Sequence, residues 1–326
     1  MNKEKYPIII PTTTKDYLRV KRDLKALLDY LPAKEIVFIG PASLEEPVKA
    51  DAVRCGIGDK VRFLNEEELL SLSYLTEVMR DRLASEGYTM AENSRPGWYY
   101  QQFLKMSFSE VCDDEYYMSW DADTLPLRHI DMFDEFGKPI FDTKAELMPG
   151  YFYTIQKLFG FNKVIEQSFI SEHMLFNKMR MHEMIEEIES LPIKGKTYYE
   201  KVIYSLSLDN VRCGFSEFET FGSWMTVRYP DEYTFREWKS MRKAGFFIKP
   251  DDFSEEDKVY LSKDYDAVTF EGYHKYVPVL AEMFRNPEYR AEISAKEFYQ
   301  ILIEEGVFGK AEFGGIADED GAISPV

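Results

Sequence analysis

Two carboxylates one residue apart, Asp121 and Asp123, directly follow an apolar run in the segment YMSWDADTLP. An extended chain turns alternate side chains to the same side, so both carboxylates would project together from the end of a strand. Close negative charges repel each other, and a divalent cation beside them is the natural compensation. The alternatives are a solvated strand end or a helix-capping pair. The pattern therefore predicts a cation site at Asp121 and Asp123.

Two other Asp-x-Asp tripeptides occur in this acidic chain, at 264–266 and 318–320. Neither follows a comparable hydrophobic run, so a rigid strand would project the carboxylates only at the first tripeptide. Context, rather than the tripeptide itself, favours Asp121 and Asp123 as the site.

Two further carboxylates, Glu217 and Glu219, flank an aromatic residue in GFSEFETFG. A positioned glutamate can act as a general base. The segment also fits a capping box, with Ser216 as the N-cap and Glu219 three residues later, which makes Glu219 structural and Glu217 the candidate base. Glu172 and His173, in SEHMLF, follow another strand-like run and are candidates for substrate contact or for structural roles.

The elements that must position these groups begin with a strand at 6–10 and a helix whose apolar residues recur every three or four positions from Tyr17 to Leu31. Strands follow in KEIVFIG and KVRFLNE, and helices in 66–87 and 98–112 lead to the strand before Asp121. Alternation of this kind indicates a mostly parallel sheet. Asp121 and Asp123 would lie at its carboxyl edge, where open α/β sheets bind ligands.

Shorter elements follow residue 130: a strand in QSFIS, helices in 177–191 and 198–208, and an amphipathic helix over 288–306 before a mobile tail. The expected organisation is one domain over 1–287, with halves 1–130 and 131–287, and a C-terminal helix and tail over 288–326.

Composition narrows the class of protein. A net charge of −18 over 326 residues argues against binding nucleic acid or anionic lipid, and a phosphate-bearing ligand would need a local cation. Three cysteines without a CxxC pair indicate a reducing compartment. The apolar run in MNKEKYPIII is too short for a signal peptide, and no later stretch reaches the roughly 20 apolar residues of a membrane span. We expect a cytoplasmic protein without a transmembrane segment.

Several familiar motifs are missing from the sequence. No GxGxxG follows the first strand, no GxxxxGK[ST] occurs, HEMIE lacks the second histidine of a zinc-protease helix, and GFSEF departs from the nucleophile elbow at its last residue. The common dinucleotide, P-loop, zinc-protease and α/β-hydrolase interpretations therefore fail.

Four stretches give the chain a resemblance to GT-A-fold glycosyltransferases, and within them to an uncharacterised bacterial family known as a domain of unknown function: IIIPTTTKDY, RPGWYYQQFLKMS, SWDADTLPL, and ISEHMLF with GFSEFETFGSW. The resemblance extends over residues 6 to about 275. The resemblance implies a Rossmann-type α/β/α sandwich with a mostly parallel central sheet. In its domain over 1–287, residues 1–130 would bind the nucleotide sugar and 131–287 the acceptor.

The activity implied is transfer of a sugar from a nucleoside diphosphate sugar, expected to be a UDP-sugar, to a hydroxyl of a glycan, lipid-linked or other acceptor. A role in bacterial surface polysaccharide or glycoconjugate synthesis is expected, as is a hexosyltransferase of the inverting type with Glu217 as base. Mn²⁺ or Mg²⁺ would neutralise the departing diphosphate.

The resemblance also assigns roles to single residues. The metal ligands implied are Asp121, Asp123 and His274, with Asp123 binding directly and Asp121 meeting the ribose or a metal-bound water. A neutral imidazole among oxygen ligands favours Mn²⁺. The residues implied for the donor are Thr12, Thr13 and Asp16 at the nucleotide base, and Arg95, Gln102 and Lys105 at the diphosphate or the sugar. The alternative for Thr12, Thr13 and Asp16 is a turn with Asp16 near the amino end of a helix.

A rival interpretation comes from the same residues. YYMSWDADTLP also satisfies hhhhDxDxT, the first motif of haloacid-dehalogenase-like phosphatases, with Asp121 as nucleophile. That motif normally lies on the first strand of its domain, whereas a complete strand-helix-strand unit precedes it here. A non-catalytic sugar-nucleotide-binding protein is the third interpretation.

Overall fold

A computed structural model describes residues 5–90, 94–145 and 148–307 of the chain. Their contacts form two compact units. The first contains the chain up to Tyr17 with Pro32–Asp121 and Met132–Glu237, and the second contains Leu18–Leu31, Ala122–Asp131 and the chain from Trp238. The boundary falls directly after Asp121, so the two motif aspartates belong to different units. These units do not coincide with the halves expected at residue 130, because each is assembled from separate stretches of chain.

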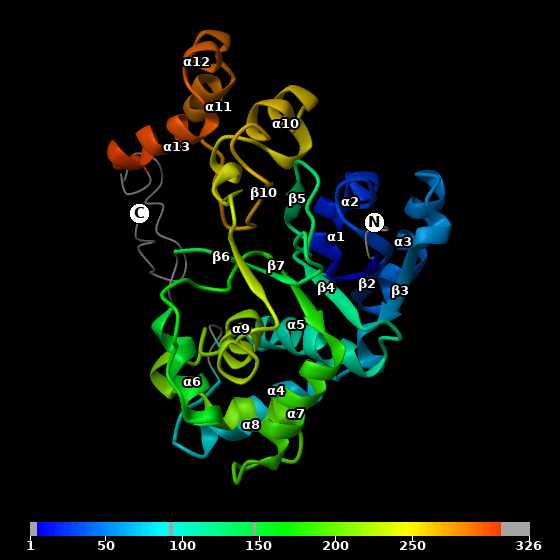
Figure 1. Ribbon diagram of the computed structural model, residues 1–326, viewed down its shortest axis with the longest axis vertical. Helices are drawn as coiled ribbons and strands as arrows, with labels where there is room; N and C mark the ends of the chain where they lie inside the picture. Colours follow the sequence, from blue (N-terminus) through cyan, green and yellow to red (C-terminus); the bar gives the residue numbers. More distant parts are fainter. Residues whose placement is uncertain (1–4, 91–93, 146–147, 308–326) are drawn as a thin grey trace. The chain divides into compact units, whose positions relative to one another are not determined.

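The first unit is built on a five-stranded sheet in the order β3-β2-β1-β4-β7 (Figure 1). Its strands are β1 (Tyr6–Pro11), β2 (Ala33–Gly40), β3 (Val61–Asn65), β4 (Tyr116–Trp120) and β7 (His173–Asn177). All neighbours are parallel except β4 and β7, which are antiparallel. The predicted α/β fold with a mostly parallel central sheet is confirmed.

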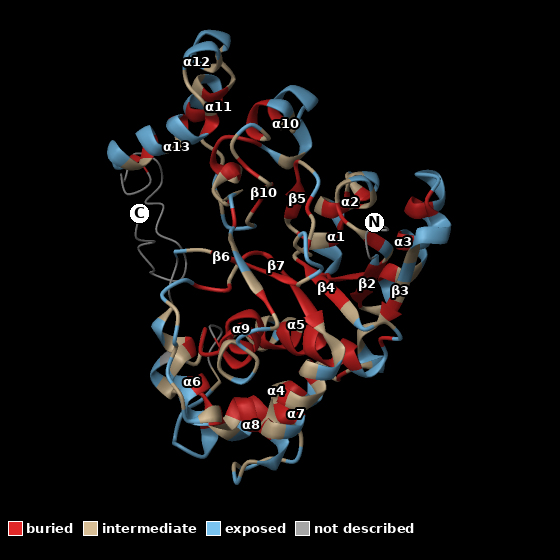
Figure 2. Ribbon diagram, viewed as in Figure 1, coloured by how far each residue is buried: buried red, intermediate tan, exposed pale blue. Residues whose placement is uncertain are grey.

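Continuous burial explains why these sequences form central strands. Every residue of β1 is buried, as are the last five residues of β2 and the last four of β4, so each strand has apolar contacts on both faces (Figure 2). A separate parallel ribbon in the same unit joins β6 (Ile140–Thr143) to β8 (Thr234–Glu237).

Most helices of the first unit share one hydrophobic core with the sheet. They are α4 (Leu72–Ala84), α5 (Pro96–Ser107), α6 (Pro149–Phe159), α7 (Lys178–Ser190), α8 (Tyr198–Ser205) and α9 (Glu217–Arg228). Helix α3 (Glu45–Arg54) buries Val48 and Ala52 outside this cluster. Helix α5 begins with Pro96, whose fixed φ suits the first turn, and most of its later residues are buried. Side chains on α5 can therefore reach the carboxyl end of β4.

The second unit contains a small sheet in the order β5-β10-β9, with β5 antiparallel to β10. Its elements are α2 (Leu24–Tyr30), β5 (Thr124–Pro126), β9 (Ser240–Met241), α10 (Glu255–Leu261), β10 (Ala267–Thr269), α11 (Pro278–Arg285), α12 (Pro287–Glu292) and α13 (Ala295–Glu304). Among the helices that the structure describes, none has the length and hydropathy of a membrane span.

Three predicted elements differ from the structure. The first predicted helix is two helices, α1 (Thr14–Val20) and α2, and the helix predicted over 288–306 is α12 followed by α13. Ser294 causes the second break, because its hydroxyl and the Glu297 carboxylate form a capping box that starts α13. QSFIS forms only a bridge between Ser168 and Lys144, and the strand begins at His173. The predicted tail lies outside the described residues from 308 onward.

Candidate active site

The first unit places Asp121 directly after Trp120, at the carboxyl end of β4. Strand β4 lies between β1 and β7 in the sheet. The backbone N–H of Asp121 donates to the carbonyl oxygen of Glu172 at 2.9 Å, so two residues singled out from the sequence lie side by side. The predicted position at a carboxyl edge is therefore observed for Asp121.

A buried ammonium group joins Asp121 to Glu217. Lys105 Nζ lies 2.8 Å from Asp121 Oδ1 and 2.7 Å from Glu217 Oε1, and 4.2 Å from the centre of the Phe218 ring. The Lys105 and Glu217 side chains are only 5% and 3% exposed, whereas Asp121 is 28% exposed. Asp121 is thus the member of this cluster that solvent or a ligand reaches most readily.

Burial and neighbouring charges together set the pKa values of Lys105 and Glu217. Burial lowers the pKa of Lys105, but the Asp121 and Glu217 carboxylates outweigh it and the net shift is upward. Burial also raises the pKa of Glu217, and Lys105 opposes that rise without cancelling it. A cationic Lys105 and a glutamate of raised pKa suit a general base, whose pKa should approach the working pH.

Glu217 is the first residue of α9, and its backbone is fixed by Gln102. The Glu217 N–H donates to Gln102 Oε1 at 3.1 Å, which satisfies one of the free donors at a helix start. Gln102 and Lys105 lie three residues apart on α5 and so reach α9 from one face. Both were expected to contact the donor. That role stays a prediction, and what the structure shows is that these two side chains hold Glu217.

The capping box predicted for Ser216 and Glu219 forms only in part. Ser216 is the N-cap and accepts the Glu219 N–H at 3.3 Å, as predicted, but the Glu219 carboxylate does not return to Ser216. It accepts instead from Ser168 Oγ at 2.8 Å, from the Phe169 N–H at 3.1 Å and from Lys163. Glu219 is 1% exposed, and this burial turns its carboxylate toward the 163–169 segment. The partners of the Glu219 carboxylate therefore differ from those expected, and its structural role stays a prediction.

Glu172 and Arg95 share an unusual backbone conformation. Their φ angles are +61° and +51°, and they are the non-glycine residues with positive φ among those the structure describes. Such strained residues concentrate at functional sites. The Glu172 carboxylate lies 2.5 Å from Lys144 Nζ, and the Arg95 guanidinium lies 5.5 Å from the Trp98 ring.

Thr12, Thr13 and Asp16 follow β1 at the same edge of the sheet. The Thr13 hydroxyl donates to Asp16 Oδ2 at 2.6 Å and accepts the Asp16 N–H at 3.2 Å, which forms the alternative predicted from sequence, a cap on α1. A Cβ at Gly40 would come within 2.6 Å of the Thr12 carbonyl oxygen, so this turn needs glycine beside it. Contact with a nucleotide base stays a prediction.

In the second unit, Asp123 directly precedes β5, and His274 lies in the chain segment that follows β10. Thr124 opposes Thr269 in the register, and the Asp123 carbonyl accepts the Phe270 N–H at 2.9 Å. His274 lies four residues after Phe270, and its ring packs at a tilt against Phe246 with ring centres 4.2 Å apart. Its buried Nδ1 has no hydrogen-bond partner in the described part of the chain.

The donor types match those a manganese ion accepts. Burial, together with Lys243 and Arg242, lowers the pKa of His274 to about 3, so its imidazole is neutral, as a metal ligand must be. Asp123 would contribute a hard oxygen donor. Within the described ranges, no three His, Cys, Asp or Glu side chains gather as ligands around one point. The metal role of Asp121, Asp123 and His274 stays a prediction.

Three contributors to this region were missed from the sequence: Lys144, Asp142 and Arg236. Lys144 pairs with Glu172, and Arg236 holds Asp142 at 2.7 Å through both carboxylate oxygens. A buried glutamate requires a cation, but the chain has 40 Lys and Arg residues and nothing local indicates which one supplies it.

Comparisons with solved structures find low similarity over most of the chain. Mouse xyloside xylosyltransferase 1 is 13% identical, with 84% of this chain and 100% of that chain covered and a TM-score of 0.45. Galactosyltransferase LgtC, in complex with donor and acceptor sugar analogs, is 12% identical, with 88% and 100% covered and a TM-score of 0.41. The glycosyltransferase GlyE of Streptococcus pneumoniae TIGR4 is 9% identical, with a TM-score of 0.36; the match covers 93% of this chain and 64% of that one.

A comparison with curated proteins finds no match. The model of one protein family, described as a family of unknown function (DUF6492), matches residues 5–259, which include Asp121, Asp123, Glu172 and Glu217. This chain belongs to that family of unknown function, DUF6492.

Proposed function

We propose that this protein is a metal-dependent glycosyltransferase that moves a sugar from a nucleoside diphosphate sugar, expected to be a UDP-sugar, to a hydroxyl of a glycan or other acceptor. The observation that carries the proposal is the cluster at the end of β4, where buried Lys105 holds both Asp121 and Glu217 and where Glu172 lies beside Asp121. A partly exposed carboxylate next to a buried carboxylate of raised pKa suits sugar binding combined with proton removal.

In this proposal Glu217 accepts the proton of the acceptor hydroxyl as that oxygen forms its bond to the sugar C1. The bond from C1 to the donor diphosphate breaks on the opposite face, which inverts the configuration at C1. Lys105 stays protonated and fixes the Glu217 carboxylate. Glu172 and Asp121 supply oxygen atoms that accept hydrogen bonds from donor hydroxyls. A hydrogen-bonded geometry of this kind orients the two reactants before the transfer.

Asp123 and His274 would hold the divalent cation, and Asp121 stands two residues before Asp123 in the chain. When bound, the cation supplies positive charge to the departing diphosphate. The hydrogen bond from the Phe270 N–H to the Asp123 carbonyl oxygen supports this assignment. It fixes the backbone of Asp123 beside Phe270, and His274 follows Phe270 by four residues. The cellular role we propose is cytoplasmic synthesis of a bacterial surface glycan or glycoconjugate.

The test is a screen of nucleotide sugars with Mn²⁺ or Mg²⁺, read as release of the nucleoside diphosphate and as a rise in melting temperature. Slow hydrolysis of one donor, accelerated by an acceptor, is the expected result. A parallel assay with phosphomonoesters separates the rival activity, since release of inorganic phosphate from them would show a phosphatase. Donor stabilisation without turnover in the presence of many acceptors would show a binding protein.

A further inference from the structure

The conformation of Glu172 requires an explanation beyond its ion pair. Its side chain is 4% exposed and its φ is +61°, a region that L-residues other than glycine seldom adopt. Such a conformation persists only where the surrounding structure fixes it. The residues on either side of Glu172 provide that constraint.

Ser171 and His173 form two hydrogen bonds with each other across Glu172. The Ser171 hydroxyl donates to the His173 carbonyl oxygen at 2.7 Å, and His173 Nδ1 donates to the Ser171 carbonyl oxygen at 2.8 Å. Both residues are buried, at 1% and 0% exposure. These two bonds close a tight loop that has Glu172 as its middle residue.

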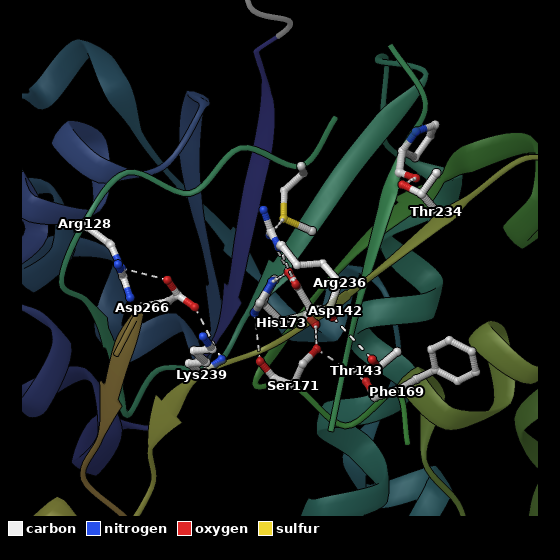
Figure 3. A network of polar contacts seen from close by, with 12 residues as sticks. Arg128, Asp142, Thr143, Phe169, Ser171, His173, Thr234, Arg236, Lys239 and Asp266 are labelled. Atoms are coloured by element: carbon white, nitrogen blue, oxygen red, sulfur yellow. Dashed lines mark hydrogen bonds and ion pairs between the residues drawn. The ribbon is translucent and has the colours of Figure 1, made fainter. Parts of the chain in front are cut away.

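The β6–β8 ribbon anchors this loop through His173. Asp142, on β6, lies 2.8 Å from His173 Nε2, and Arg236, on β8, binds both Asp142 oxygens at 2.7 Å (Figure 3). The His173 ring also packs against Trp120, with ring centres 5.2 Å apart. Asp142 is held as the anion, because the bonds from Arg236 and His173 outweigh burial and lower its pKa.

The loop is connected to the proposed site at two atoms of Glu172. Its carbonyl oxygen accepts the Asp121 N–H, and its carboxylate accepts from Lys144, whose backbone pairs with Ser168. A shift of the loop would therefore move the Glu172 carboxylate and Asp121, directly after β4, together.

We propose that Asp142, His173 and Arg236 are positioning residues that fix Glu172 and Asp121, so that the β6–β8 ribbon is a functional part of the sugar site. The inference that they act on sugar transfer rests on the proposed function. The positioning itself is a property of the folded chain and can be measured without any substrate.

The first test is amide hydrogen exchange in Asp142→Asn, followed in peptides that contain Asp121 and residues 171–173. Loss of the anion weakens the His173 anchor, and we expect exchange there to accelerate on the order of tenfold or more, while peptides from β1 stay unchanged. Asp257→Asn is the matched control: Asp257 is also a buried aspartate bound by arginines, Arg285 and Arg290, but it belongs to the second unit. It should leave the exchange of the Asp121 peptide as in the wild type.

Two milder variants keep the test decisive if Asp142→Asn does not fold. Ser171→Ala removes one of the two bonds across Glu172, and Arg236→Lys keeps the charge but loses the two-pronged contact. Faster exchange at Asp121 in either variant supports the proposal. Wild-type exchange in all the folded variants of this set overturns it.

Transfer assays separate this proposal from the proposed function. With an identified donor, Asp142→Asn should lower kcat on the order of tenfold, whereas Asp257→Asn, with a comparable loss of melting temperature, should not. Equal kcat in both variants would overturn the functional part of the proposal. If the wild type uses no donor but the exchange result holds, the proposed function fails and the positioning role stands.

Discussion

At the scale of single residues, the buried ammonium of Lys105 organises the carboxylates at the end of β4. It brings together Asp121 and Glu217, which lie almost a hundred residues apart in the chain, and Gln102 fixes the helix start that carries Glu217. The charge arrangement leaves Glu217 buried beside one cation. This environment gives Glu217 and Glu219, two residues apart, different expected phenotypes.

Glu217→Gln should keep the fold and donor affinity but reduce sugar transfer by about 10²-fold or more, the contribution of a positioned base. The amide oxygen can still accept from Lys105, and Lys105 keeps its ion pair with Asp121, so no buried charge is left without a counterion. Donor hydrolysis should partly survive, because departure of the diphosphate does not need this base. The measurement is the rate of glycoside formation beside the rate of donor hydrolysis. Transfer at the wild-type rate, or a product that retains the donor's anomeric configuration, would remove Glu217 from the base role.

Glu219→Gln is the matched variant. It breaks a buried ion pair with Lys163, and we expect it to lower the free energy of unfolding by about 3 kcal/mol or more. Transfer by the protein that remains folded should be close to normal. Urea denaturation and an assay well below the transition measure the two effects. A stable but inactive variant would contradict the structural assignment of Glu219.

Residues on one side of these contacts could be predicted from the sequence, whereas several of their partners could not. Gln102, Lys105, Asp121 and Glu217 were all named from motifs and lie in one cluster, because the second half of α5, the end of β4 and the start of α9 meet there. Lys144 pairs with Glu172 across 28 residues of chain and carries no motif of its own. Partners of this kind are selected by tertiary packing, which local patterns do not encode.

At the scale of elements, capping determines where helices end and how they join. Ser294 splits the predicted C-terminal helix, and in α10 the Asp257 carboxylate accepts the Ser254 N–H at 3.2 Å and binds Arg285 of α11 and Arg290 of α12. A periodic apolar pattern continues through such a break, so the sequence predicted one helix where the structure has two. The central strands could be predicted because continuous apolar runs of this length are typical of strands that are buried on both faces.

Asp257→Asn should alter how stability depends on pH. Burial would raise the pKa of Asp257, but the bonds from Arg290, Arg285 and Ser254 outweigh it and the net shift is downward. A lowered folded-state pKa gives stability that is present above the unfolded value, about 3.9, and is lost as the pH falls through the folded value. At pH 7 the variant should be less stable by about 1.5–3 kcal/mol.

The difference between wild type and Asp257→Asn should shrink as the pH falls below about 4, since the unfolded wild type then binds a proton at this carboxyl and the folded protein does so only at lower pH. Urea denaturation at several pH values measures it. A difference that stays constant or grows toward low pH would contradict the ionic role of Asp257.

At the scale of the whole molecule, chain topology determines what could be predicted about the fold, and net charge determines how a charged ligand can bind. The fold class could be predicted because alternation of strands and helices specifies a parallel sheet. The two units could not, since the second gathers 18–31, 122–131 and the chain from 238, and contacts between such distant stretches leave no local pattern. The charge of −18 opposes any diphosphate ligand, which makes a bound cation the expected means of holding one.

UDP and Mn²⁺ together should therefore raise the melting temperature more than the sum of their separate effects. A ligand at about 100 times its Kd adds about 2.7 kcal/mol to stability. His274→Ala should remove most of the joint effect but leave the melting temperature of the free protein similar, because His274 is only partly buried. Thermal melts with each component alone and combined measure this. An unchanged joint effect in His274→Ala would exclude it as a metal ligand.

The most direct test of the central claim is sugar transfer from the donor found by screening, measured for the wild type and Asp123→Asn with Mn²⁺ and with excess chelator. The proposal predicts transfer by the wild type with Mn²⁺, loss of it in chelator with recovery on adding metal, and no transfer by a folded Asp123→Asn variant. Full transfer in excess chelator, or wild-type transfer by Asp123→Asn, would contradict metal-dependent glycosyl transfer at this motif.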